Sequence, residues 1–267
     1  MRGIGNRERD AHAQPASRSR RSRLAPVVGL LLLLVSAAAT AATTGHAHAS
    51  GAPHPPVRPS RVTLHAPQLT IARLQYDGGG DWYANPSSLP NLLAAIRERT
   101  SLNVDKTEAR LRLTDDRLWD YPFIHVTGHG NIKLSDEEVV RLREYLTRGG
   151  FLHVSDNYGI DESFRRELKR VFPDRALVDV PLTHPIYHIV YPFPKGVPKI
   201  HEHDGKPARG FGIFLGDRLA VFYDYESDLG NGWEDPEVYH DPPALHEAAL
   251  RMGVNLFVYA VTSRPIP

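Results

Sequence analysis

The sequence predicts an α/β fold in which a mainly parallel sheet is covered by helices on both faces. Short apolar segments such as Phe123–Thr127 and Phe151–Ser155 have the length and composition of buried strands. Each is followed by a polar turn and then by an amphipathic helix, and the connections are short. This alternation is typical of strands that point the same way and are joined by crossover helices.

The first strand and helix of this fold begin near residue 69. An apolar segment over residues 69–74 runs into a glycine-rich turn, and residues 89–99 carry a helical apolar stripe that we expect Ser88 to cap. A short strand should follow at residues 102–105. Residues 106–120 are ambiguous, because leucines first alternate with arginines as in an exposed strand and the end of the segment fits one helical turn.

The two strands already named each lead into a helix with recognisable ends. Ser135 opens a capping box before the first helix, and the pair Gly149-Gly150 ends it. We expect Asp161 to cap the second helix and Pro173 to stop it.

The last third of the chain is less regular. Residues 177–180 fit a strand, and proline-rich segments follow it. Residues 211–215 and 219–223 flank the pair Gly216-Asp217 and predict a hairpin. A final buried helix is expected to begin at Asp241, after a long polar loop.

The residues before this domain read as an export signal and a linker. An arginine-rich start, an apolar core at 24–42 and the A-x-A pattern at 47–49 are typical of a secretory signal peptide. The segment Ser19–Leu24 partly resembles a twin-arginine signal. The predicted organisation is a signal peptide at 1–49, a Pro-rich linker at 50–67, one α/β domain at 68–262 and a tail at 263–267.

This organisation predicts an exported protein, either periplasmic or secreted. The alternative is an uncleaved signal that anchors the chain to a membrane by its N-terminal segment. Lys and Arg number 32 and Asp and Glu 31, so the balance of charge predicts no nucleic-acid partner. The chain has no cysteine, which excludes disulfides, thiolate metal sites and cysteine nucleophiles.

Three residues with acidic or imidazole side chains follow the ends of three predicted strands. If the strands are parallel, Asp77, His129 and Asp156 converge at one edge of the sheet, which is where open α/β sheets bind ligands. A histidine oriented by a carboxylate is the usual general base, and Asp77 or Asp156 could orient His129. The amides of Gly78, Gly79 and Gly80 could face a developing oxyanion. The alternative is that the acids cap turns and His129 bonds to a loop carbonyl.

A second group of acids and rings follows the late strand. It consists of Asp224, Glu226, Asp228 and Trp233, and Trp82 with Tyr83 would supply further rings. Asp81 and Asn157 add polar groups from the earlier strand ends. Aromatic rings beside carboxylates suit sugars, because rings cover the apolar face of a sugar while acids bind its hydroxyls. The alternative is an acidic surface loop that contains one tryptophan.

Several histidines have spacings that are compatible with a functional role. His201 and His203 lie two residues apart and could ligate a divalent metal together with His129 or Asp156, although a polar loop explains them as well. His125 and His153 occupy matching positions in neighbouring strands, and we expect both to be buried and hydrogen-bonded under a helix layer.

The segments YDGGGDWY, YPFIHVTGHG, RGGFLHVSDN and HPIY together resemble the domain-of-unknown-function 4159 family. That family is similar in fold to class I glutamine amidotransferases and trehalose-utilisation-type proteins. The resemblance covers about residues 68–262 and implies a flavodoxin-like three-layer sandwich, without implying an activity. Amidotransferases place a cysteine at a strand–helix elbow, where Thr127-Gly128-His129-Gly130 stands here, so a cysteine-dependent amidotransferase activity is excluded.

The sequence therefore favours an exported binding or accessory module of the cell envelope, with an acidic and aromatic cleft. Its partner would be a small polar ligand such as a glycan or polyol, or an envelope protein. The alternative is a hydrolase that uses His129 with Asp77 or Asp156, with a divalent metal as the cofactor that the residues allow.

Overall fold

Seven strands form one mixed, mostly parallel sheet in the computed structural model, which describes residues 69–263. The order across the sheet is β2-β1-β3-β4-β7-β6-β5. The strands β1, β2, β3, β4 and β7 are parallel, and β6 runs antiparallel to β5 and β7. Their bounds are β1 Ile71–Leu74, β2 Ala109–Leu111, β3 Phe123–Val126, β4 Phe151–Val154, β5 Val178–Asp179, β6 Phe211–Leu215 and β7 Arg218–Tyr223.

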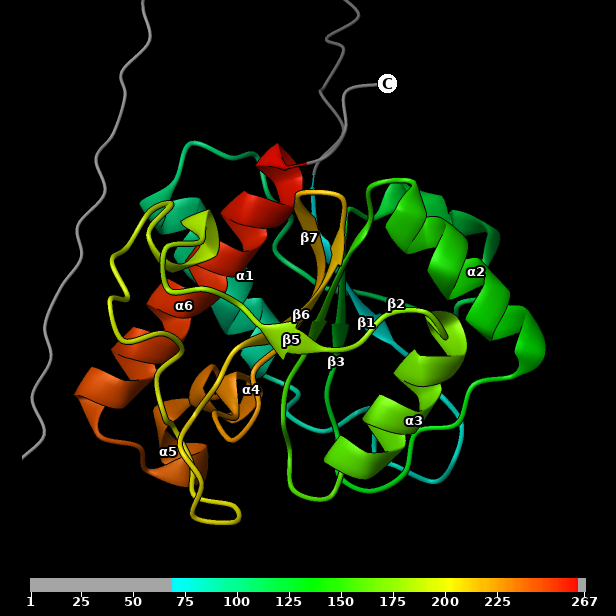
Figure 1. The fold of residues 1–267 in the computed structure, drawn as a ribbon. Coiled ribbons are helices and arrows are strands. Elements are labelled where there is room, and N and C mark those ends of the chain that lie inside the picture. The colour runs from blue at the N-terminus through cyan, green and yellow to red at the C-terminus, as the bar shows by residue number, and fades with distance from the viewer. Residues whose placement is uncertain (1–68, 264–267) are drawn as a thin grey trace, which may run out of the picture. The chain divides into compact units, whose positions relative to one another are not determined.

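Helices cover both faces of the sheet (Figure 1). The helices α1 and α6 pack together on one face, and α2 and α3 pack together on the other. Successive residues of a strand serve the two sides in turn, so Phe123 lies in the core beneath α1 and α6 while Ile124 lies in the core beneath α2 and α3. The helices are α1 Ser88–Arg99, α2 Asp136–Thr147, α3 Asp161–Val171, α4 Leu229–Gly232, α5 Pro236–Tyr239 and α6 Pro243–Thr262, with 3-10 turns η1 Asp116–Asp120 and η2 Pro185–Tyr187.

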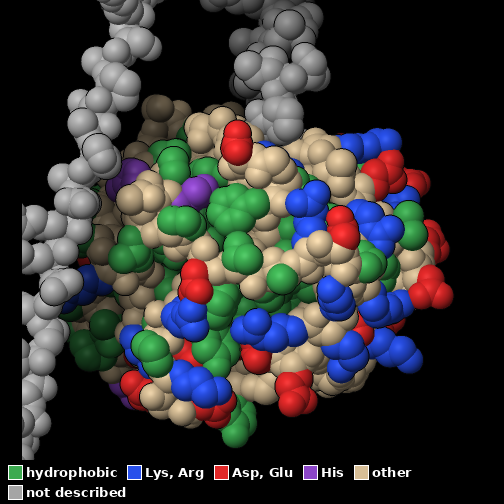
Figure 2. Space-filling model, in the orientation of Figure 1, with side chains coloured by type: hydrophobic (Ala, Val, Ile, Leu, Met, Phe, Trp, Pro, Cys, Tyr) green, Lys and Arg blue, Asp and Glu red, His purple; other side chains and the backbone are tan. Residues whose placement is uncertain are grey.

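The predicted signal peptide, the linker and nearly all of the short tail lie outside the described residues. Within the described part of the chain, no helix is long and apolar enough to cross a membrane. Figure 2 shows Lys and Arg side chains mixed with Asp and Glu side chains over α2 and α3. One such pair between these helices is Arg170 with Asp136 at 2.6 Å.

Several predicted helix ends are confirmed and two predicted caps are wrong. Ser135 and Glu138 form the expected capping box at the start of α2. Ser88 does not cap α1, because it lies inside the helix and its hydroxyl donates to the Asn85 carbonyl at 2.7 Å. Asp161 does not cap α3, because it is also a residue of the helix and its carboxylate accepts a hydrogen bond from Tyr223 at 2.9 Å.

The ambiguous region after α1 contains both of the structures that its sequence suggested. Residues 109–111 form the edge strand β2, and residues 116–120 form a 3-10 turn. The strand expected at 102–105 is reduced to one bridge between Leu69 and Val104.

His125 and His153 are fully buried on neighbouring strands, as predicted. Their Nδ1 atoms are 3.0 Å apart and their rings stack at 5.1 Å. Because a hydrogen bond needs one donor, one histidine carries its proton on Nδ1 and the other accepts through Nδ1. Burial lowers the pKa of both rings well below the ordinary value, and for His153 to about 3.

Candidate functional site

The carboxyl ends of the parallel strands meet at one edge, which holds the predicted residues. Asp77, His129 and Asp156 follow β1, β3 and β4 on this edge, as the parallel order requires. Their side chains nevertheless have different partners. Asp77 is 65% exposed and pairs with Arg112 at 3.1 Å, while Asp156 is buried. The predicted pairing of His129 with either of these acids is therefore not formed.

His129 is instead paired with Asp81 from the loop after β1. The Nδ1 atom of His129 lies 3.1 Å from Oδ2 of Asp81, and the other carboxylate oxygen accepts from the His129 amide. A carboxylate only accepts, so it holds the proton on Nδ1 and leaves Nε2 as a base. The ring is 46% exposed, and the pair joins the loops after β1 and β3. Because β2 lies on one side of β1 and β3 on the other, the loops after β1 and β3 flank the topological switch point of the sheet.

The glycine turn after β1 is used to pack loops together. The amide of Gly80 donates to the Asn131 carbonyl at 3.1 Å, so it is not available to an oxyanion and the role predicted for it is wrong. Gly78 has a φ of 115°, and a Cβ there would lie 2.7 Å from the Asn131 carbonyl oxygen. Gly79 is exposed, with a φ of 92°.

A buried amide, Asn157, connects the strand-end loops behind this surface. Its Oδ1 accepts from the Thr127 hydroxyl at 2.7 Å and from the Gly128 amide at 2.9 Å. Its Nδ2 donates at 2.9 Å to Oδ1 of Asp228 and at 2.9 Å to Oδ1 of Asn231. Asn157, predicted to bind ligand, therefore holds the loops after β3, β4 and β7 in fixed positions.

Asn85 extends this network to the loop after β1. Its Nδ2 donates to Asn231 at 2.6 Å, and the Tyr239 hydroxyl donates to its Oδ1 at 3.0 Å. The buried Arg73 holds the backbone here by donating to the Asn85 carbonyl at 3.0 Å, and Glu108 binds the same guanidinium at 2.9 Å. These contacts could not be predicted from the sequence, because Asn85 and Asn231 are 146 residues apart.

The acids after β7 are brought together as predicted, but at different depths. Asp224 is fully buried and accepts from the amides of Asp156 and Leu229 at 2.6 and 3.1 Å. Burial raises its pKa well above the ordinary value. Its predicted contact with a ligand is wrong, because the side chain has no exposed surface. Asp156 is 4% exposed and accepts from the Tyr223 hydroxyl at 2.5 Å and from the Glu226 amide.

The two histidines proposed as metal ligands face carboxylates. Nε2 of His203 is 3.2 Å from Asp228, and its Nδ1 is 3.8 Å from Asp156. The nearby carboxylates of Asp156 and Asp228 raise the pKa of His203 to about 10. Asp228 and Asp241 likewise raise the pKa of His201, whose Nε2 is 3.0 Å from Asp241. In the part of the chain that the structure describes, no group of three or more His, Asp or Glu residues is arranged to hold a metal ion. The ring nitrogens of both histidines instead face the carboxylates of Asp156, Asp228 and Asp241.

A pocket of about 380 Å³ opens beside these groups. Its floor is formed by acids at the ends of β4 and β7, and its walls come from the start of α3 and from the loop that carries His203. The lining residues are Asp156, Tyr158, Gly159, Asp161, Glu162, His203, Asp204, Lys206, Tyr225 and Glu226.

The rings of this pocket are not the tryptophans that the sequence suggested. Trp233 is fully buried, donates from Nε1 to the Ala249 carbonyl at 2.8 Å and packs on the two core histidines. Trp233 is therefore a core residue, which corrects the prediction. Trp82 is half-buried and packs on the core beneath α2 and α3. The pocket contains Tyr158, which is 65% exposed, and Tyr225 instead.

Four residues other than glycine adopt left-handed backbone conformations in the described chain, and all lie in the loops of this edge. They are Asn85, Glu226, Asp228 and His240, with φ between 56° and 62°. Such conformations cost free energy and often occur at functional sites. Here Glu226 and Asp228 are also nearly inaccessible to solvent, at 1% and 2% exposure.

The fold and the site together define an α/β protein with a polar, acid-rich pocket at the carboxyl edge of a mostly parallel sheet. The family described as "Domain of unknown function (DUF4159)" matches residues 70–261, and the chain belongs to this family. No curated protein matches the sequence.

Proposed function

We propose that this is an exported cell-envelope protein whose pocket binds a small polyhydroxy ligand, such as a glycan unit or a polyol. The observation that carries the proposal is the composition of the pocket of about 380 Å³, where five carboxylates surround two tyrosine rings. Carboxylates accept hydrogen bonds from hydroxyl groups, and an exposed ring packs on the apolar face of a sugar. The cell-envelope location is inferred from the export signal that the sequence predicts at residues 1–49.

The fold proposal is a flavodoxin-like three-layer sandwich similar to class I glutamine amidotransferases. Its support is the strand order β2-β1-β3-β4-β7 of the parallel part, which is the flavodoxin-like order. Because the chain has no cysteine, a cysteine-dependent amidotransferase activity does not accompany the fold.

The test of the binding proposal is a thermal-shift screen with monosaccharides and polyols. Binding to the folded state raises the melting temperature by mass action. Tyr158→Ala should abolish the shift, because it removes the exposed ring of the pocket. Tyr83→Ala is the matched control, since Tyr83 is 64% exposed but does not line the pocket. A panel in which no sugar or polyol shifts the melting temperature would contradict the proposal, and so would equal losses in the two variants.

A second candidate function is hydrolysis with His129 as the general base. The observation that favours it is the 3.1 Å contact between His129 Nδ1 and Asp81, which orients the ring with Nε2 free. In this proposal Nε2 takes a proton from a water molecule while the water oxygen bonds to the electrophilic atom of the substrate. The scissile bond then breaks, and the protonated Nε2 returns its proton to the leaving group. Asp81 thus takes the orienting role first considered for Asp77 or Asp156.

One substitution distinguishes the two functions. His129→Ala should abolish turnover if the protein is a hydrolase and should leave sugar affinity largely intact if it is a binding module. His188→Ala serves as the control, because His188 is exposed and lies outside this edge.

A further inference from the structure

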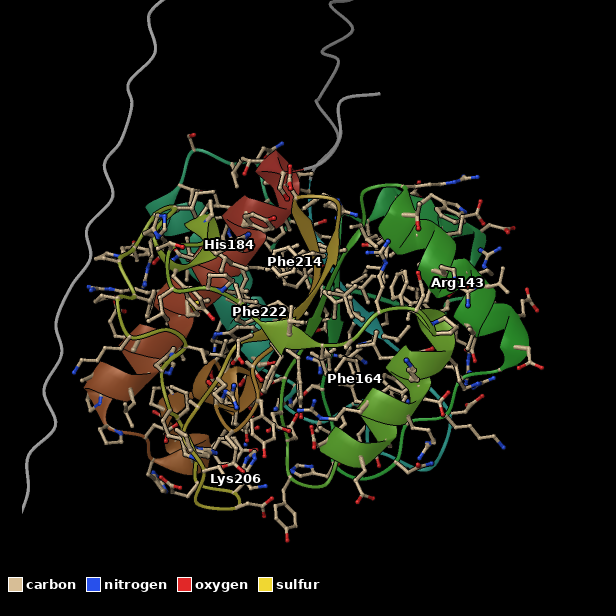
Figure 3. The ribbon with its side chains drawn as sticks, viewed as in Figure 1. Arg143, Phe164, His184, Lys206, Phe214 and Phe222 are labelled. Carbon is tan, nitrogen blue, oxygen red and sulfur yellow. The ribbon has the colours of Figure 1, made fainter. Side chains whose placement is uncertain are left out.

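The loop over the pocket is anchored at its two ends by backbone hydrogen bonds. The amides of Ile200 and Arg209 donate at 2.9 Å to the carbonyls of Ser227 and Tyr225. Between these anchors, residues 202–208 form neither helix nor strand. We call residues 202–208 the strap. It follows η2 and precedes β6, and Lys206 within it is labelled in Figure 3.

The strap is attached to the body mainly through charged and polar groups. The amide of Asp204 donates to Glu226 at 3.1 Å, and Lys206 Nζ donates to the Tyr225 hydroxyl at 3.0 Å. Within the strap, the side chain of His203 is only 8% exposed and lies between Asp156 and Asp228, while Ala208 at its end packs against the core. Segments with few buried apolar contacts open locally at a lower free energy than a sheet does.

The inner face of the strap covers two residues with strained backbone conformations. Glu226 and Asp228 have left-handed conformations and are almost fully buried. Asp156, Glu226 and His203 line the pocket, whereas Asp228 does not, because His203 stands in front of it. Movement of His203 would therefore join the pocket to Asp228 and to the amide network behind it.

We propose that the strap is a closing element of this pocket and that His203 is its latch, displaced when a ligand binds between Asp156 and Asp228. This inference rests on the proposed binding function. A ligand that replaces His203 must satisfy two nearly buried carboxylates, and leaving a buried charge unpaired is strongly unfavourable. A sugar that carries an amine is therefore a better occupant than a neutral one.

Amide hydrogen exchange of the ligand-free protein tests the latch. His203→Gln removes the cation and should speed exchange of the Asp204 amide by about tenfold or more, because charge-assisted hydrogen bonds are lost. The amides of Ile200 and Arg209 should keep their rates, since they belong to the anchors. His188→Gln is the control and should change none of the three. His203→Asn provides a second variant with the same expectation.

Two exchange results would overturn the latch. One is an unchanged rate at the Asp204 amide in both His203 variants. The other is an equal acceleration at Ile200, Asp204 and Arg209, which would mean that the region opens as a whole.

The ligand preference is tested separately with glucosamine and glucose on the wild-type protein. Glucosamine should raise the melting temperature more than glucose does and should speed exchange at the Asp204 amide. An effect of glucosamine no larger than that of glucose would overturn the preference for an amine. Because the exchange experiment uses no ligand, failure of the latch is distinguishable from failure of the binding proposal.

Discussion

The buried pair His125 and His153 should make the protein sensitive to mild acid. Burial lowers the pKa of His153 from 6.5 to about 3 in the folded state, and the pKa of His125 is lowered in the same direction. The unfolded chain therefore binds protons that the folded chain does not. As pH falls below 6.5, the two histidines lower the free energy of unfolding, and the contribution of His153 stops changing only below about pH 3. The raised pKa of Asp224 acts in the opposite direction, but it is one group against two, so the free energy of unfolding should still decrease.

The size of this effect follows from the shift in the pKa of His153. Each pH unit in this window costs about 1.4 kcal/mol per histidine, so His153 alone removes roughly 3 kcal/mol over about two units. That is a large part of the stability of a typical domain. The pKa values of Glu226 and Glu247 are lowered in the folded state, so both also destabilise the protein at still lower pH.

The assay is urea unfolding followed by circular dichroism at several pH values between 7 and 4.5. The double variant H125L/H153F replaces both partners by apolar side chains, so neither ring is left with an unpaired neighbour. Its stability should fall less steeply with acid than that of the wild type, by roughly 3 kcal/mol or more over the window. The pocket histidines and the carboxylates that do not touch the pair are unchanged in this comparison, so they cancel. Asp224 does touch it, with Oδ2 at 3.3 Å from His153 Nε2, so the comparison is made with Asp224→Asn in both proteins. His188→Gln should behave as the wild type does, and a double variant with the wild-type slope would refute the reasoning.

Three further substitutions test the packing that supports the site. Glu108→Gln should lower the free energy of unfolding by about 3–5 kcal/mol, because it leaves the buried Arg73 guanidinium without its carboxylate. Arg110→Gln, on the exposed side of the same acid, should cost under about 1 kcal/mol, and comparable losses in the two variants would contradict this account. Trp233→Ala should cost about 3–5 kcal/mol in chemical unfolding, and a cost near zero would return this tryptophan to the ligand site. Ser135→Ala should cost about 1 kcal/mol through loss of the capping box, and an unchanged midpoint of thermal unfolding would show that the cap adds nothing.

The pattern of strands and helices was predictable because it depends on local composition. Phe123–Val126 and Phe151–Val154 are apolar throughout, and buried parallel strands need that composition on both faces. The direction of the strands then placed Asp77, His129 and Asp156 at one edge without any knowledge of the loops. The buried histidine pair followed from the same register, since His125 lies opposite His153.

The contacts within the edge were not predictable, because they depend on how each loop turns. Positive φ angles at Gly78 and Gly79 redirect the chain after β1, so Asp81 rather than Asp77 reaches His129. Trp233 lies in a polar stretch of sequence, yet it is buried against α6, where a Cβ at Gly253 would come within 3.0 Å of its ring. The polar composition around Trp233 predicts a surface position, and its burial depends on packing against α6.

The strained residues of the edge bear on whether the site is more than a by-product of the fold. Left-handed conformations at Glu226 and Asp228 cost about 1 kcal/mol or more each, and glycine at either position would remove the strain. Both side chains bind polar partners: Glu226 accepts from Lys199, and Asp228 accepts from Asn157 and from the Asn231 amide at the start of α4. What the acids supply is a fixed set of carboxylate oxygens beneath the strap and beside the pocket. Strained acids gathered at the edge where parallel sheets bind ligands favour a binding site over a scaffold with no ligand of its own.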